Sequence, residues 1–247
     1  MSDPYDRIIW SADVNDVATL VNWLDQMPKL RRIKIDRTFV DGNDWDVFEI
    51  LRERAIEVFD DAKISEIPSK LEAIAKIHAR RAQPWMLNCM ASGGLSNLDY
   101  DISSEEKDGL KRFADACHCA FVQPCAVSVL TSKSPAAIEL EYGNRTSTEQ
   151  VLVYATELVK AGFTHLVCSP LEVSAIRDEP FLDVLALVTP GVRPAGSDTG
   201  DQQRVDTPAN TIMNGSNYLV IGRPITQGAG TPAENLDAIA AEIEPLV

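Results

Sequence analysis

The sequence predicts a single (β/α)8 barrel, the TIM-barrel type of α/β fold, because short apolar runs alternate with amphipathic stretches along the whole chain. Eight strand–helix units fit within its 247 residues, and about 250 residues is the usual length of this fold. The runs are apolar at nearly every position, as parallel strands buried on both faces require. No linker or low-complexity stretch divides the chain, so residues 1–247 are expected to form one domain.

Each predicted strand is a short run rich in Val, Ile and Leu. The eight strands are expected at residues 8–13, 32–35, 56–63, 85–90, 126–130, 165–168, 184–188 and 218–221. Between them apolar residues recur three or four positions apart, which predicts helices. The helices are expected at residues 17–24, 47–51, 71–77, 104–116, 151–159, 171–176 and 208–213, and from Pro232 onward. Residues 92–108 are expected to contribute an extended loop at the rim of the barrel.

The charge balance argues against several classes of partner. The formal net charge is −14 and the isoelectric point is about 4.6, so no general basic field exists to attract nucleic acids or anionic membranes. No apolar run approaches the ~18 residues of a membrane span. The N-terminus lacks the basic start and apolar run of a signal peptide. We therefore expect a cytoplasmic protein that binds neither nucleic acid nor membranes.

The five cysteines are an odd number in a chain without a visible secretory signal, so we expect reduced core residues rather than disulfides. The run Cys117-His118-Cys119 and the nearby Cys125 could suggest metal ligation. Their spacing fits no standard zinc pattern, and we predict no metal site there.

Charged residues collect at the carboxyl ends of the predicted strands, where barrel enzymes place their active sites. Asp61 and Lys63 close the third strand, and side chains two positions apart on a strand share a face. Glu66 lies just beyond them. Other strand ends supply Asp13, Lys34, Thr131, Arg193 and Arg223. A surface ion pair would explain Asp61 and Lys63 alone, but charges at several strand ends of one rim favour a functional site.

The loops after the seventh and eighth strands predict a phosphate site, because these two loops often hold phosphate in such barrels. Gly222 would let backbone N–H groups approach an anion, and Arg223 would supply a fork of donors. The long loop between Arg193 and Gln202 contains glycines and could fold over a bound ligand. The alternative is a loop that is merely flexible.

Several separated motifs, in the right order, resemble one enzyme family, that of orotidine 5'-phosphate decarboxylase. The family signature Asp-x-Lys-x-x-Asp-Ile-Pro is matched by residues 61–68, which read DAKISEIP. The family's carboxyl-terminal pattern is matched by TPGVRP at 189–194, GDQ at 200–202 and VIGRPITQ at 220–227. The resemblance runs essentially from end to end of the chain.

The resemblance implies a cofactor-free and metal-free decarboxylation of orotidine 5'-phosphate to UMP and carbon dioxide. Lys63 would stabilise the carbanion at carbon 6 of the pyrimidine and donate the proton. Asp61 would lie where the substrate carboxylate arrives, and Lys34 would complete the charge network. The family is a homodimer with shared active sites, and Glu66 would be the acid lent to the partner.

The resemblance also implies how the nucleotide is held. Asp13 and Lys34 would contact the ribose, and Thr131 would lie at the pyrimidine. The phosphate would be bound by Arg193, Gln202, Gly222 and Arg223, with Gln202 reaching from the loop toward the base.

Four positions depart from the family pattern. Glu66 stands for an aspartate, Lys70 for a threonine that touches ribose across the interface, Met90 for a histidine and Lys133 for a methionine. The added methylene of Glu66 shifts its carboxylate by roughly an ångström, a scale that can lower a rate ~100-fold. These departures leave open a weak or inactive homologue that binds UMP. A metal-dependent sugar-phosphate lyase also stays open, because related enzymes of the same superfamily share the Asp-x-Lys-x-x-Asp core.

Overall fold

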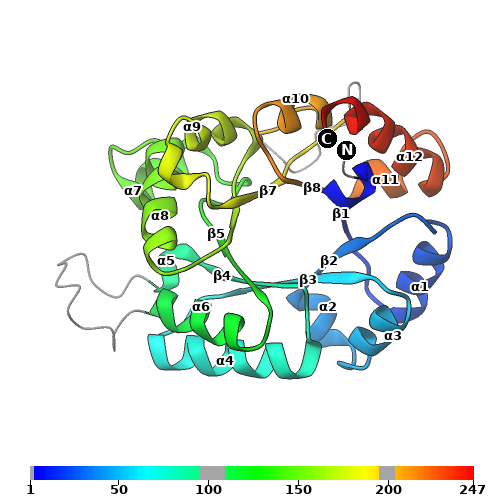
Figure 1. Ribbon diagram of the computed structural model, residues 1–247, viewed down its shortest axis with the longest axis horizontal. Helices are drawn as coiled ribbons and strands as arrows, with labels where there is room; N and C mark the ends of the chain where they lie inside the picture. Colours follow the sequence, from blue (N-terminus) through cyan, green and yellow to red (C-terminus); the bar gives the residue numbers. More distant parts are fainter. Residues whose placement is uncertain (1–2, 95–108, 195–203) are drawn as a thin grey trace.

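The computed structural model describes residues 3–94, 109–194 and 204–247. Its eight parallel strands close into a barrel in chain order, and β8 pairs with β1 (Figure 1). The strands are β1 Ile8–Ser11, β2 Arg32–Asp36, β3 Glu57–Ile64, β4 Met86–Met90, β5 Gln123–Val127, β6 His165–Val167, β7 Ala186–Pro190 and β8 Tyr218–Ile221. The predicted (β/α)8 fold is confirmed.

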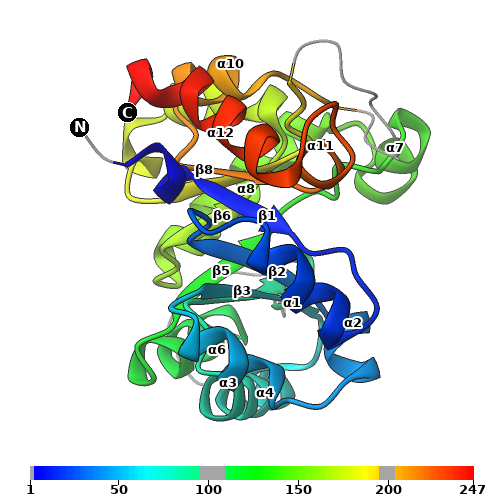
Figure 2. The ribbon, with the colours of Figure 1, turned by 90° about the vertical axis from the view of Figure 1, so that its right-hand side faces the viewer.

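The helices surround the strands. They are α1 Val17–Asp25, α2 Arg37–Gly42, α3 Val47–Glu53, α4 Pro68–Ala82, α5 Ala91–Gly94, α6 Gly109–Cys119, α7 Pro135–Tyr142, α8 Ser147–Lys160, α9 Val173–Arg177, α10 Pro208–Met213, α11 Arg223–Thr226 and α12 Pro232–Ile243. Short 3-10 turns occur at Pro4–Arg7, Pro170–Glu172, Pro180–Leu182 and Glu244–Leu246. Seen from the side, α10, α11 and α12 lie on one side of the barrel and α3 and α4 on the opposite side (Figure 2).

Some predicted boundaries were wrong. The fifth strand ends at Val127 rather than at Leu130, because the chain turns there into the rim of the barrel. The seventh strand begins at Ala186, since Val184 is exposed and precedes the sheet. Helices α2 and α7 were missed because 6 and 8 residues give little periodicity. Residues 92–94 of the expected loop belong to α5, and residues 95–108, including the expected helix start, lie outside the described residues.

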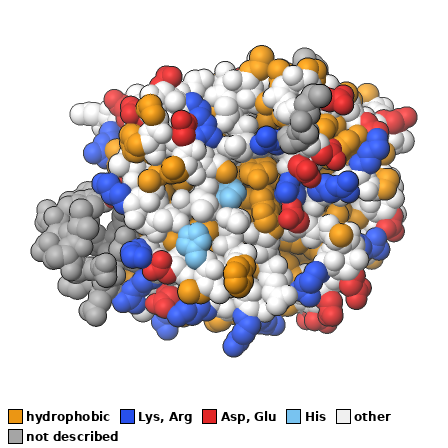
Figure 3. Space-filling model, viewed as in Figure 1, with side chains coloured by type: hydrophobic (Ala, Val, Ile, Leu, Met, Phe, Trp, Pro, Cys, Tyr) orange, Lys and Arg blue, Asp and Glu red, His pale blue; other side chains and the backbone are white. Residues whose placement is uncertain are grey.

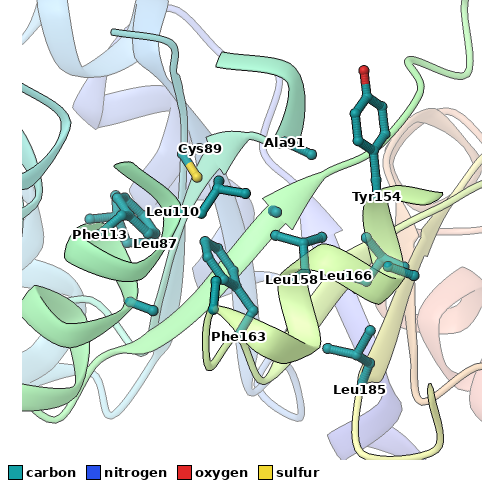
Figure 4. Packing of buried hydrophobic residues seen from close by; sticks show 14 of the residues in the cluster. Leu87, Cys89, Ala91, Leu110, Phe113, Tyr154, Leu158, Phe163, Leu166 and Leu185 are labelled. Atoms are coloured by element: carbon teal, nitrogen blue, oxygen red, sulfur yellow. The ribbon is translucent and has the colours of Figure 1, made fainter. Parts of the chain in front are cut away.

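Apolar side chains fill both the barrel and the space between the strands and the helices. The interior cluster is Ile9, Phe59, Met86, Cys125, Val188 and Val220. Outside it, Phe113 of α6 stacks on Phe163 with ring centroids 5.7 Å apart. Figure 4 shows these rings beside Cys89 of β4 and Leu158 of α8. Four of the five cysteines are buried, as expected for core residues.

The face of the molecule seen in Figure 3 carries Lys and Arg side chains scattered among Asp and Glu, with no continuous basic area. None of the helices in the described part of the chain is long and apolar enough to cross a membrane.

A cluster of aromatic rings around one arginine closes the amino-terminal end of the barrel. The guanidinium of Arg32 lies 4.7 Å from the ring centroid of Trp85 and 5.5 Å from that of Tyr218. His165 stacks on Tyr218 and meets Trp85 edge-on. Because this end of the barrel is packed with rings, the opposite end is left to form a site.

Acid should weaken the fold through His165. Burial, with the nearby charge of Arg32, lowers the pKa of His165 from 6.5 to about 4. Between these two pH values the unfolded chain takes up a proton that the folded chain refuses. Stability from this group is therefore complete above about pH 6.5 and is lost as the pH falls toward 4, by up to about 3 kcal/mol.

Urea unfolding at pH 7 and at pH 4.5 checks this expectation. His165→Phe keeps a ring against Tyr218 but cannot titrate, so its unfolding free energy should fall less between the two pH values than that of the wild type. An equal fall in both proteins would contradict the assignment.

Candidate active site

A cavity of about 300 Å³ opens at the carboxyl ends of the strands. Most of the site residues predicted from the sequence line it: Asp13, Lys34, Asp61, Lys63, Thr131, Arg193, Gly222 and Arg223. They come from the ends of β1, β2, β3, β5, β7 and β8, so the closed sheet brings together residues that are up to 210 positions apart.

Two predicted site residues do not line this cavity. Glu66 and Lys70 lie beyond the end of β3, and both side chains are exposed. Gln202 lies outside the described residues, as do the two glycines considered as hinges. Lys133 is absent from the lining of this cavity, since it pairs with Glu141 and lies over the ring of Tyr142.

The centre of the cavity is an alternating charge network. One oxygen of Asp61, Oδ2, lies 2.9 Å from Lys34 Nζ and 2.6 Å from Lys63 Nζ. The side chains of Asp61 and Lys34 are 6% and 14% exposed, whereas that of Lys63 is 41% exposed. Lys63 is therefore the member of the network that is most accessible to a ligand.

Opposite charges hold this network in its ionised form. Burial by itself would raise the pKa of Asp61, but the ammonium groups of Lys34 and Lys63 outweigh it and lower that pKa to about 2. Burial by itself would lower the pKa of Lys34, but Asp61, with smaller contributions from Asp13 and Asp36, raises it overall. At neutral pH the Asp61 carboxylate and the Lys34 ammonium thus face each other, both largely buried.

The backbone of β3 is irregular where it carries these groups. Its register against β4 shifts between Asp60 and Ile64, and Lys63 adopts a left-handed conformation with φ of 45°. The contact between Asp61 and Lys63 that simple strand alternation predicts is present, but it is made from a bulged strand.

Sequence reasoning missed Asn88. This fully buried residue of β4 donates from Nδ2 to Asp61 Oδ1 at 2.6 Å and accepts from the backbone N–H of Lys63 at 2.7 Å. The signal that could have found it is an amide at the centre of the otherwise apolar run Met86–Met90. A buried amide needs hydrogen-bond partners, and because β4 lies beside β3, the polar groups of β3 are the nearest candidates.

The loops after β7 and β8 bring cationic donors to the same cavity. Arg193 and Arg223 line it together with Gly222. A Cβ at Gly222 would lie 3.3 Å from Asp13 Oδ2 and 3.3 Å from Ser11 Cβ, so a side chain would fit only if these neighbours moved. Strands β3 and β7 are four positions apart in the closed sheet of eight. The Asp61–Lys63 network and Arg193 therefore approach the cavity from opposite sides.

The described residues contain no group of three or more His, Cys, Asp or Glu side chains that could hold a metal ion. In the run considered from the sequence, Cys117 is buried, Cys119 is exposed and His118 contacts the backbone carbonyl of Gly162.

Comparisons with known proteins agree on one family. The model of the orotidine 5'-phosphate decarboxylase / HUMPS family matches residues 6–239. The orotidine 5'-phosphate decarboxylase of Moorella thermoacetica is 39% identical over 243 residues, which cover 97% of this chain and 92% of that protein. The enzyme of the same name from Actinobacillus succinogenes is 37% identical over 239 residues, which cover 96% and 97%.

Two solved structures have the same fold as this chain. The crystal structure of orotidine 5'-phosphate decarboxylase from Lactobacillus acidophilus superimposes with a TM-score of 0.79 at 25% identity, and the match covers 96% of this chain and 98% of that one. An uncharacterized conserved protein from Geobacillus kaustophilus has a TM-score of 0.75 at 22% identity, over 95% and 99% of the two chains, which shows a shared fold.

Proposed function

The chain belongs to the orotidine 5'-phosphate decarboxylase / HUMPS family, and we propose that it is a carboxy-lyase that converts orotidine 5'-phosphate to UMP and carbon dioxide. One observation carries this proposal. The Lys34–Asp61–Lys63 network lies in a cavity that Arg193 and Arg223 also line, and Arg193 enters it from the side opposite β3. Such a cavity can bind a phosphate at one side and offer fixed charges to a reacting ring at the other.

The network suits a reaction that creates negative charge on carbon. When the bond between carbon 6 and the carboxylate breaks, its electron pair stays on carbon 6 as carbon dioxide leaves. The Lys63 ammonium stabilises that pair and then donates a proton to it, after which water returns a proton to the Lys63 amine. Asp61, which is itself paired with Lys34, holds the ammonium in place, so little reorganisation is needed as the charge develops. We propose that no metal or cofactor takes part.

The other lining residues hold the nucleotide in this proposal. Arg193, Arg223 and the backbone at Gly222 bind the phosphate, and Gln202 joins them from the loop after β7. Thr131 lies at the pyrimidine, while Asp13 and Lys34 contact the ribose. Binding the phosphate far from carbon 6 contributes to catalysis by fixing the ring against Lys63.

We further propose that the enzyme acts in the cytoplasm as a homodimer that shares its active sites. Glu66 and Lys70 are exposed and do not line the cavity of their own chain. Ile67, between them, is 62% exposed, so the same segment also offers an apolar side chain for a contact with a second copy. A second copy would cover Ile67 and would receive Glu66 and Lys70 at the rim of its own cavity.

A complementation experiment tests the shared site. Lys63→Ala and Glu66→Ala should each be nearly inactive alone. If Glu66 acts on the partner, a mixed dimer has one site with both defects and one site with neither. Equal mixing and exchange of subunits should therefore restore about one quarter of the wild-type sites. Failure of the mixture to regain activity, although mixed dimers form, would show that Glu66 serves its own chain or neither.

The reaction itself is tested by its products. Purified protein incubated with orotidine 5'-phosphate should yield UMP and carbon dioxide in equal amounts. Folded protein that binds UMP by calorimetry but forms no product would be a binding homologue instead. Magnesium-dependent cleavage or condensation of sugar phosphates, without formation of UMP, would support the lyase alternative.

A further inference from the structure

Asn88 is the buried polar group closest to the charge network that has no place in the chemistry above. Asn88 lies on β4 with its side chain fully buried, and it forms hydrogen bonds with Asp61 and Lys63 of β3. We propose that Asn88 is a positioning residue that orients the Asp61 carboxylate and fixes the backbone of Lys63. The inference rests on the proposed function, because its importance for catalysis depends on the roles of these two residues.

The acceptor half of the amide supports the backbone of Lys63. A residue other than glycine with a positive φ is strained by about 1–3 kcal/mol and persists where its surroundings hold it. The shift of register between Asp60 and Ile64 interrupts the regular ladder with β4. Asn88 Oδ1 supplies an acceptor for the N–H of Lys63 at 2.7 Å. This bond holds the residue in the conformation from which Nζ reaches Asp61.

The donor half of the amide orients the carboxylate. Asn88 Nδ2 binds Oδ1 of Asp61 at 2.6 Å, which leaves Oδ2 for the two ammonium groups. Only a side chain that both donates and accepts can satisfy the two β3 groups at once. Alanine supplies neither function, and an ionised carboxylate supplies only the acceptor.

In Asn88→Asp, the pH decides whether the side chain at position 88 can still donate a hydrogen bond as well as accept one. When protonated, the introduced carboxyl can donate its O–H to Asp61 and accept from the N–H of Lys63, as the amide does. When ionised, it is a second carboxylate beside Asp61 and repels it. Burial and this repulsion favour the protonated form, so the amide-like state should prevail toward acidic pH. The other titratable groups that act on Asp61 or sense its charge are Lys34, Lys63, Asp60 and Cys125.

The experiment measures kcat and KM of wild type and Asn88→Asp at roughly pH 5 to 8, a range that brackets a carboxyl raised by burial. The kcat of the variant, divided by that of the wild type, should fall about tenfold to 100-fold as the pH rises. The affinity for UMP should change much less, because Arg193 and Arg223, which are proposed to bind the phosphate, do not contact Asn88. Asn88→Ala should be impaired at every pH.

Asn217→Asp is the matched control, since it makes the same replacement at the amino-terminal end of β8, where Asn217 accepts from Arg177 and from the backbone N–H of Leu187. Its ratio to the wild type should not recover in acid. A pH-independent ratio for folded Asn88→Asp, or wild-type kcat at every pH, would overturn the inference. If the wild type itself fails to turn over substrate, the proposed function fails separately. The pH dependence of the melting temperature of Asn88→Asp then still tests its coupling to Asp61.

Discussion

Replacing Lys63 with alanine should reduce turnover of orotidine 5'-phosphate by about 10⁵-fold, because one side chain supplies both the fixed positive charge and the proton. The loss should appear in kcat. Binding of UMP should be weakened far less, since Arg193 and Arg223 remain in the cavity. Steady-state rates together with calorimetric titration of UMP separate the two effects.

Lys76→Ala is a suitable control for this variant. Lys76 lies on α4, is 62% exposed and pairs with Glu72 away from the cavity. Its removal should leave kcat unchanged. If Lys63→Ala retained more than about one hundredth of the wild-type rate, the proton and the charge would come from another group.

Replacing Asp61 with asparagine should lower kcat by at least about 10³-fold and should also destabilise the fold. The new amide would face Lys34 and Lys63 with an N–H donor or with an uncharged oxygen. The Asp61 carboxylate now pairs with these two ammonium groups at 2.9 Å and 2.6 Å. Breaking a buried ion pair by removing one partner costs about 3–5 kcal/mol. The buried Lys34 would lose its main counter-charge, so its pKa should fall.

Urea unfolding and kcat measured on the same preparation test Asp61→Asn. Asp115→Asn is the control, because Asp115 pairs with Lys111 at an exposed position of α6. It should change the unfolding free energy by less than about 1 kcal/mol. An Asp61→Asn enzyme that kept both its stability and its rate would show that the Lys34–Asp61–Lys63 network is not required for catalysis.

The barrel could be predicted from the sequence because its strands are apolar at nearly every position and its longer helices are strongly periodic. The eighth strand was predicted with its observed bounds, Tyr218–Ile221, since charged or turn-forming residues flank that apolar run. The same reasoning placed Asp13, Lys34, Asp61 and Arg223 together, because the carboxyl ends of parallel strands share one edge.

What escaped prediction depends on local backbone geometry. Strand alternation cannot foresee that Lys63 is left-handed, because lysine has no preference for that conformation. The role of Asn88 depends on the shift of register beside it, which exists only once β3 and β4 are paired. The roles of Glu66 and Lys70 cannot be decided from the cavity of one chain, since neither side chain lines it.

The measurement that tests the central claim most directly is the ultraviolet progress curve of metal-stripped wild-type protein with orotidine 5'-phosphate in excess EDTA. We predict rapid conversion to UMP at the same rate with and without EDTA, and loss of that conversion in Lys63→Ala. Folded, dimeric protein that binds UMP but leaves the absorbance unchanged, or a rate that disappears with EDTA, would contradict the account.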